Sequence, residues 1–184
     1  ESSCNNNTVS GNNMTNTGYG IILGSSSVNT VSGNTITNTT FPGVLLSSYC
    51  NNNIISGNTI TNTSIGVLLV WSSGNTISRN TITNTSRGVD LRSSSVNTVS
   101  GNTITNTGYG IKLDSSSNNK FYHNNFINNT QQATVGGTNT WDDGYPSGGN
   151  YWSDYNERYP DAEELDDSGI WDTPYVIDES NQDN

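Results

Sequence analysis

The sequence predicts an all-β protein, a single-stranded parallel β-helix in which each coil of chain stacks on the coil before it. Residues 25–39 and residues 93–107 both read SSSVNTVSGNTITNT, and imperfect copies lie between them. The Gly-Asn pair of this repeat, or its equivalent, recurs in steps of 22, 24, 22, 22 and 22 residues. A fixed period of this size is typical of a solenoid. Helical repeats are excluded because Thr, Ser, Asn and Gly dominate and no apolar stripe with a 3.6-residue period occurs.

Each coil is expected to contain three short strands separated by tight corners. In the second coil these are 30–32, 35–37 and 44–46, where apolar and polar residues alternate between Gly and Asn. Such alternation predicts strands that turn one side towards a core. We therefore expect about six coils of 22–24 residues.

Four columns of inward-facing residues predict that core, because equivalent positions of stacked coils lie one strand spacing apart. Asn side chains at equivalent corners can form amide ladders in the same way. The columns are Val9, Val31, Ile55, Ile77, Val99 and Phe121; Met14, Ile36, Ile60, Ile82, Ile104 and Phe126; Ile21, Val44, Val67, Val89 and Ile111; and Leu23, Leu46, Leu69, Leu91 and Leu113.

Charge and aromatic content change along the chain. Residues 1–130 are the nearly uncharged repeats, and residues 131–184 carry most of the carboxylates and three of the four Trp residues. We expect residues 131–184 to form an irregular aromatic and acidic cap that packs on the last coil. The net charge of −10 argues against nucleic acid and anionic membrane surfaces as partners, and no apolar run is long enough to span a membrane.

Catalysis is not expected from the coils, since general acid–base chemistry on polysaccharides needs paired titratable groups along one groove. Asp90 and Lys112 lie one coil apart in an outward column, as do Arg92 and Asp114, and we interpret both as surface ion pairs. A less expected alternative is a polysaccharide lyase or hydrolase. Another is an ice-binding protein, because outward Thr pairs form a regular grid, although Thr is also a good strand former.

An exposed apolar patch is expected on the outer side of the third strand of each coil. Such patches mark contact surfaces. The patch could be covered by the chain's own C-terminal segment, by another subunit, or by a sugar that binds Tyr19 and Tyr109. Its residues are Tyr19, Ile22, Phe41, Leu45, Ile65, Leu68 and Tyr109.

Six Asn-x-Ser/Thr sequences are weak glycosylation signals, because chance matches are common in this composition. Three of them share one corner of successive coils, and an amide that points inward there could not carry a glycan. The six acceptors are Asn6, Asn13, Asn38, Asn62, Asn84 and Asn128.

The coil pattern N-x-I-x-G-N-x-I-x-N-x-x-x-G-I-x-L is followed by NNFINNT, WDDGYPSGGNYWSDY and SGIWDTPYVID. Together they resemble the NosD-like parallel β-helix repeat proteins of archaeal cell surfaces, over essentially the whole chain. The motif GGNYWSDY…DTPYVID is the specific part. The resemblance implies a right-handed β-helix and an extracellular or cell-surface location.

The same resemblance implies a calcium loop, because related sequences carry D-x-D-x-D-G-I-G-D where this chain has Glu164, Asp166, Ser168 and Asp172. Alternate oxygen ligands with Gly at the sixth position suit Ca²⁺. Two of the four differ from the pattern, Trp171 replaces a Gly, and a solvated acidic turn is the alternative. No copper is expected, since one His, one Met and two separated Cys form no soft-ligand cluster.

The function predicted from these features is a non-enzymatic extracellular structural protein, a subunit of a surface layer, adhesin or filament. A β-helix has two open ends with unpaired strand edges, and ends of different shape favour head-to-tail homopolymers. The alternative is a carbohydrate-binding β-helix module with surface glycans as partners.

Overall fold

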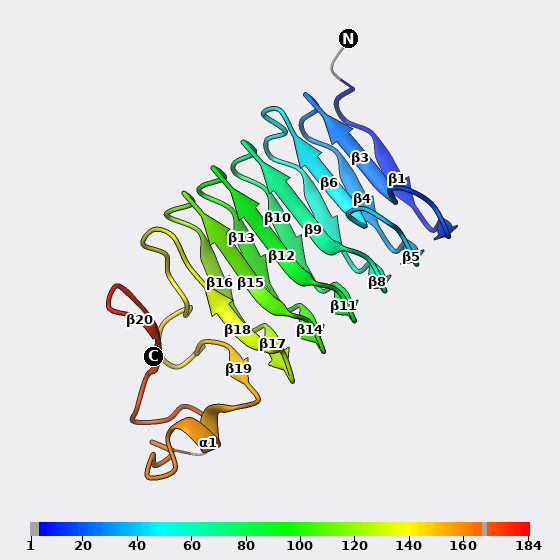
Figure 1. The fold of residues 1–184 in the computed structure, drawn as a ribbon. Helices are drawn as coiled ribbons and strands as arrows, with labels where there is room; N and C mark the ends of the chain where they lie inside the picture. The colour runs from blue at the N-terminus through cyan, green and yellow to red at the C-terminus, as the bar shows by residue number, and fades with distance from the viewer. Residues whose placement is uncertain (1–3, 167–168) are drawn as a thin grey trace.

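The computed structural model describes residues 4–166 and 169–184, and it forms a β-solenoid of three parallel sheets (Figure 1). Sheet A comprises β1 (Thr8–Ser10), β4 (Thr30–Ser32), β7 (Ile54–Ser56), β10 (Thr76–Ser78), β13 (Thr98–Ser100) and β16 (Lys120–Tyr122). Sheet B comprises β2 (Asn13–Thr15), β5 (Thr35–Thr37), β8 (Thr59–Thr61), β11 (Thr81–Thr83), β14 (Thr103–Thr105), β17 (Asn125–Ile127) and β19 (Tyr151–Trp152). Sheet C comprises β3 (Ile21–Gly24), β6 (Val44–Ser47), β9 (Ile65–Val70), β12 (Arg87–Arg92), β15 (Tyr109–Asp114) and β18 (Gln131–Thr134). This confirms the predicted parallel β-helix.

The predicted core columns are the inward rows of the three sheets. Val31 pairs with Ile55 in sheet A, Ile60 with Ile82 in sheet B, and all four side chains are fully buried. The ladders also continue past residue 130, because β18 pairs with β15 and β19 pairs with β17. Part of the segment that we assigned to the cap therefore completes the sheets.

Two ladders of buried Asn side chains hold the corners around sheet A. In each ladder the amide oxygen of one Asn accepts hydrogen bonds from the backbone N–H and the side chain of the Asn one coil earlier. Asn58, for example, donates both to Asn80 Oδ1 at 2.9 Å, and Asn80 Nδ2 donates to the carbonyl of Ile55. The ladders are Asn29, Asn53, Asn75, Asn97, Asn119 and Asn139, and Asn34, Asn58, Asn80, Asn102, Asn124 and Asn150.

Aromatic side chains from the C-terminal segment close the last coil. Trp141 stacks on Phe121 with ring centroids 4.3 Å apart, and Trp152 stacks on Phe126 at 4.5 Å. The C-terminal segment also contains helix α1 (Tyr155–Arg158) and an antiparallel hairpin of β20 (Tyr175–Asp178) and β21 (Asn181–Asp183). Figure 1 shows this segment at the end of the solenoid opposite to the N-terminus. The described residues include no helix that is long and apolar enough to cross a membrane.

Asp183 is a buried carboxyl group in this end packing, and it should give the protein a distinct pH dependence. Burial raises the pKa of Asp183 to about 7, although hydrogen bonds from Asn150 and Trp152 act in the opposite direction. Between the ordinary carboxyl pKa of about 4 and this value, the folded chain binds more protons than the unfolded chain. The contribution of Asp183 to stability is therefore present below about pH 4 and is lost as the pH rises to about 7.

Asp183→Asn should remove this loss, because an amide does not titrate. The denaturant midpoints of parent and variant are measured at several pH values from about 4 to 8. Because only the parent loses the contribution of Asp183, the midpoint of the variant should rise relative to that of the parent as the pH rises. Asp178→Asn, which changes an exposed carboxylate of the same hairpin, is the matched control. Parallel curves for the parent and Asp183→Asn would contradict the assignment.

Candidate functional site

The outer face of sheet C holds most of the charged side chains of the coils. Strands β9, β12 and β15 have six residues each, twice the length of the strands in sheets A and B that they connect. Residues 68, 90 and 112 are in register, and they alternate with inward-facing core positions. They therefore form one outward row, and residues 65, 87 and 109 lie at the start of the same strands.

Asp90 lies at the centre of an ion-pair cluster on this face. Arg87 Nη1 and Arg92 Nη2 each lie 2.8 Å from Asp90 Oδ2, and only 1% of the Asp90 side chain is exposed. The two Arg side chains are 30% and 40% exposed. The hydrogen bond to Asp90 raises the pKa of Arg92. One buried carboxylate therefore fixes two partly exposed guanidinium groups on one strand.

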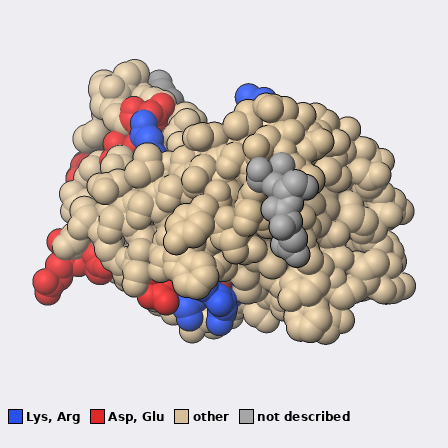
Figure 2. All heavy atoms as spheres, turned by 90° about the horizontal axis from the view of Figure 1, so that it is seen from above, with Lys and Arg blue, Asp and Glu red and all other residues tan. Residues whose placement is uncertain are grey.

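Lys112 extends this cluster into the next coil. It pairs in register with Asp90, and its Nζ lies 5.0 Å from the ring centroid of Tyr109. Three of the chain's six Lys and Arg residues thus gather on two adjacent strands of a protein with a net charge of −10. Figure 2 shows that much of the visible surface is uncharged and that acidic side chains gather towards one end.

The expected ion pairs between coils are arranged differently from our interpretation. Asp90 and Lys112 are register neighbours, as are Arg92 and Asp114, but the closest partners of Asp90 are the two Arg residues on its own strand. The reason is that residues 90 and 92 point to the same side of a strand, and the side chain of Arg87 is long enough to reach back along that side. The sequence did not indicate that the carboxylate would be buried.

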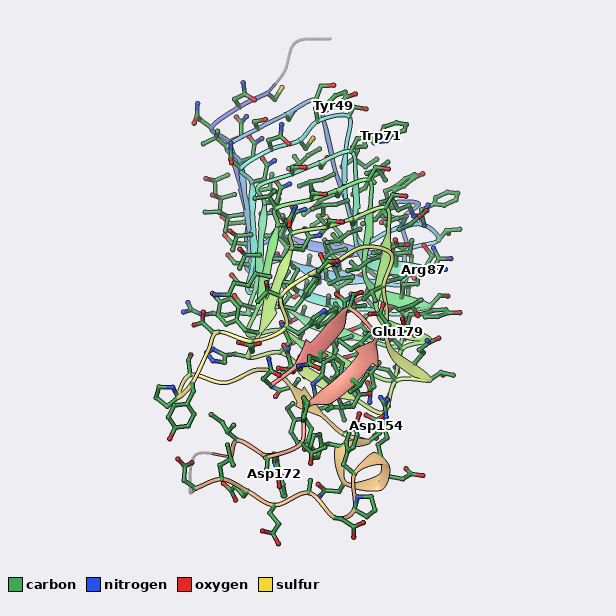
Figure 3. The ribbon with its side chains drawn as sticks, turned by 90° about the vertical axis from the view of Figure 1, so that its left-hand side faces the viewer. Tyr49, Trp71, Arg87, Asp154, Asp172 and Glu179 are labelled. Carbon is green, nitrogen blue, oxygen red and sulfur yellow. The ribbon has the colours of Figure 1, made fainter. Side chains whose placement is uncertain are left out.

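Exposed aromatic side chains border the same face at the corner that follows sheet C. Tyr49 is 72% exposed and Trp71 is 56% exposed, and their backbones are hydrogen-bonded to each other. Figure 3 shows them on successive coils. Our sequence reasoning missed both residues, although each follows a predicted strand at a position where an outward polar residue would be ordinary.

The predicted apolar patch is assembled at the N-terminal half of sheet C, but its exposure is uneven. Tyr19 and Phe41 stack with centroids 4.7 Å apart, and Ile22 is 53% exposed. Ile65 and Leu68 are buried. The exposed part of the patch is therefore the aliphatic Ile22 together with the stacked rings of Tyr19 and Phe41. Leu45 is partly buried, and Tyr109 lies at the far end beside Lys112. Self-association through this patch stays a prediction.

The carboxylates of the acidic loop expected to bind calcium accept hydrogen bonds from the loop backbone and from Tyr145. Glu164 accepts a hydrogen bond from Gly169 N, and Asp172 accepts one from Glu163 N. Asp166 accepts a hydrogen bond from the Tyr145 hydroxyl at 2.7 Å. Ser168 lies outside the described residues. Within 4–166 and 169–184, no group of three or more His, Cys, Asp or Glu side chains is placed to hold a metal, and calcium binding stays a prediction.

All six predicted glycosylation acceptors, Asn6, Asn13, Asn38, Asn62, Asn84 and Asn128, are exposed. The corner shared by three of them forms an outward row, in which Asn62 Nδ2 donates to Asn38 Oδ1 at 3.1 Å. The inward ladders belong to other Asn residues. Glycosylation stays a prediction.

Comparison with solved structures finds carbohydrate-active β-helix enzymes. The periplasmic alginate epimerase AlgG is 28% identical with a TM-score of 0.66, and a double-mutant form of it is 26% identical with a TM-score of 0.65. In both cases the match covers 72% of this chain and 33% of the epimerase chain. DFA-IIIase from Arthrobacter chlorophenolicus A6 matches at 14% identity and a TM-score of 0.55, over 61% of this chain and 28% of the enzyme, which shows the shared fold. No curated protein matches the sequence.

These similarities correct our expectation of a non-enzymatic protein. The alginate epimerase resembles this chain both in structure and, at 26–28% identity, in sequence. The sequence favours a non-enzymatic protein for two reasons. Titratable residues are sparse in the coils, and Asp90 and Arg92 are interpreted there as members of two separate surface ion pairs. The cluster on sheet C shows that these sparse charges are concentrated at one place.

A family model described as periplasmic copper-binding protein (NosD) matches residues 2–157. The absence of copper, which we expect from the sequence, stays a prediction. Cys50 is buried at a position where most coils have Ser, and it accepts a hydrogen bond from Ser26 N. His123 lies at the last coil and contacts Ser147. The match instead follows the coil repeat through all the sheets, and by that repeat the chain belongs to the NosD family.

Proposed function

We propose that this chain binds an acidic, uronate-type polysaccharide across the outer face of sheet C and acts on it as a β-helix enzyme. The observation that supports this proposal best is the cluster of Arg87, Arg92 and Lys112 around the buried Asp90. The likeness to the alginate epimerase supports the same ligand class, because alginate is a polymer of uronates. It also favours the carbohydrate-binding reading of the sequence over the filament subunit.

The cluster suits carboxylates that recur along a polymer. Guanidinium groups bind carboxylates through two parallel hydrogen bonds, and a fixed guanidinium loses less side-chain entropy on binding than a mobile one. Asp90 neutralises one of the three positive charges and holds both Arg side chains, while 30% and 40% of those side chains remain exposed to a ligand. Elsewhere the strongly acidic chain would repel a polyanion, so binding should be confined to this face.

Aromatic residues on both borders of the face suit the rings of the sugar units. Trp71 lies next to β12, since its backbone N–H donates to the carbonyl of Arg92, and Tyr109 lies beside Arg87 in the next coil. Aromatic faces attract the C–H faces of pyranose rings and supply large contact areas at low entropic cost. A polymer that crosses β12 would therefore meet an aromatic ring at each end of the Arg pair.

The same arrangement favours proton abstraction next to the carboxylate. Positive charges that bind a uronate carboxylate stabilise the negative charge that develops when its C5 proton is removed. The Tyr109 hydroxyl lies at the register position beside Arg87, and we assign to its phenolate form the removal of the C5 proton. In elimination, the phenol so formed gives this proton to the glycosidic oxygen that leaves C4. In inversion, water supplies a proton to the opposite face of C5 and the phenol returns its proton to solvent. Tyr109→Phe should therefore abolish turnover and keep binding.

Binding of alginate oligosaccharides should depend on the Arg pair. We expect isothermal titration calorimetry to show binding that weakens with added salt, and the double variant Arg87→Ala with Arg92→Ala to bind at least about tenfold more weakly. Arg79→Gly is the control, because it removes a cation at a corner where four of the other coils have Gly. Neutral cello-oligosaccharides of equal length should not compete.

Turnover is followed on the same oligosaccharides, by NMR for inversion at C5 and by ultraviolet absorbance for unsaturated uronates. Loss of affinity in Arg79→Gly equal to that in the double variant would show that only net charge matters and would overturn the assigned site. Binding without either reaction would overturn the enzymatic part of the proposal.

An extracytoplasmic location is supported by the chain's membership of the periplasmic NosD family and by its likeness to the periplasmic epimerase. A position at the cell surface, as expected from the sequence, remains part of the proposal.

A further inference from the structure

A second candidate site lies at the closed end of the solenoid, away from sheet C. It is a cleft of about 480 Å³ between the corner that joins sheets A and B, the strand β19, helix α1 and the C-terminal residues. None of the described residues that line it belongs to a strand of sheet C. Any ligand of this cleft is therefore bound independently of the function proposed above.

A buried oxygen atom without a partner lies in the wall of this cleft. Asp183 is 5% exposed. Its Oδ2 accepts hydrogen bonds from Asn150 N, Asn150 Nδ2 and Trp152 Nε1 at 2.7–3.0 Å. Its Oδ1 has no hydrogen-bond donor among the described residues. Buried polar atoms are nearly always paired with protein or with ordered water, so an unpaired oxygen in the wall of a cleft is a place for a donor from a bound water or ligand.

Because Gly149 has no side chain, the Asp183 carboxylate can pack directly against its backbone. A Cβ built on Gly149 would lie 1.5 Å from Asp183 Oδ1, and both residues line the cleft. The position next to the ladder residue Asn150 must therefore lack a side chain for Oδ1 to lie where it does.

Aromatic rings form another part of the lining. Trp171 is 36% exposed, Tyr151 is 57% exposed, and the ring of Tyr155 lies 5.5 Å from that of Trp171. The Tyr155 hydroxyl is already used, since it donates to the carbonyl of Thr173. An exposed Trp and a hydrogen-bond acceptor in the lining of one cleft offer a stacking surface and a polar anchor, which together suit a hydroxyl-bearing ring.

Charge decides the class of that ring. The described lining contains Asp183 and His123 but no Lys or Arg, and the ring Nε2 of His123 is already hydrogen-bonded to the Ser147 carbonyl. The negative charge of Asp142 also helps to raise the pKa of Asp183. A uronate would meet like charge without a compensating cation, whereas a neutral sugar can donate a hydroxyl proton to Oδ1. We propose that this cleft binds one neutral pyranose unit, with a hydroxyl group on Asp183 Oδ1 and the ring against Trp171.

The test uses the whole chain and methyl glycosides of glucose, galactose and mannose as probes, with glucuronate as the charged comparison. We expect saturation-transfer NMR and Trp fluorescence to detect at least one neutral glycoside, and Trp171→Ala and Asp183→Asn each to weaken it about tenfold. Trp171→Ala changes a partly exposed side chain, so it keeps the test valid if Asp183→Asn disturbs the end packing.

Two controls separate this site from its surroundings and from sheet C. Tyr145→Ala changes an exposed aromatic residue of the same segment outside the cleft lining and should have no effect. The double variant Arg87→Ala with Arg92→Ala should lose alginate binding and keep glycoside binding. The proposal is overturned if no neutral glycoside binds, if Trp171→Ala binds as well as the parent, or if glucuronate competes equally for the cleft.

Discussion

Asn80→Ala is expected to lower the free energy of unfolding by roughly 3 kcal/mol or more, because an unsatisfied buried polar group costs about 1–3 kcal/mol and several are created at once. The Asn80 side chain accepts hydrogen bonds from Asn58 N and Nδ2 and donates to the carbonyl of Ile55 and to Asn102 Oδ1. Alanine would leave the Asn58 N–H and the Ile55 carbonyl buried without these partners. Denaturant unfolding followed by circular dichroism measures the loss.

Asn125→Ala is the matched control, since Asn125 is exposed on β17 and makes one long side-chain hydrogen bond, at 3.4 Å, to Thr103. We expect a change within about 0.5 kcal/mol, as for most surface substitutions. Equal effects of the two substitutions would show that the ladder does not contribute more than an ordinary surface amide.

Ile60→Ala is expected to lower the free energy of unfolding by about 2–5 kcal/mol through the loss of buried apolar area and the cavity that it leaves. Ile60 is fully buried in the middle of sheet B, between Ile36 and Ile82, and its Cγ2 lies 2.6 Å from where a Cβ of Gly43 would be. Rigid neighbours on three sides limit how far the site can collapse. Ile60→Asn should be worse, because it buries an amide with no assured partner.

Ile54→Ala provides the comparison within the same coil. Ile54 is 45% exposed at the start of β7, so the same substitution there removes little buried area and opens no cavity. A loss at residue 54 as large as that at residue 60 would mean that unfolding of this solenoid does not depend on its core packing.

The repeat predicted the parts of this fold that depend on periodicity. Once the Gly-Asn pairs are aligned, the pairing of Ile36 with Ile60 and of Val67 with Val89 follows, because register is set by the inward rows. The ion pairs of Asp90 were not predictable from this alignment, since they depend on how far each Arg side chain reaches along its own strand. The cleft at the closed end was equally hidden, because it is built from irregular chain that follows no period.

The number of residues between successive sheets indicates which corners of this solenoid can change in length during evolution. The core positions of sheets A and B are separated by the same number of residues in different coils, as Val31 and Ile36 are and as Ile77 and Ile82 are. The two Asn ladders flank sheet A in these coils. The 24-residue step instead arises from single extra residues in the other two corners, near Phe41 and near Tyr49. Both of these aromatic residues project from the molecule. New side chains can thus be acquired beside sheet C by insertion, while tandem duplication of whole coils lengthens the face without disturbing the register.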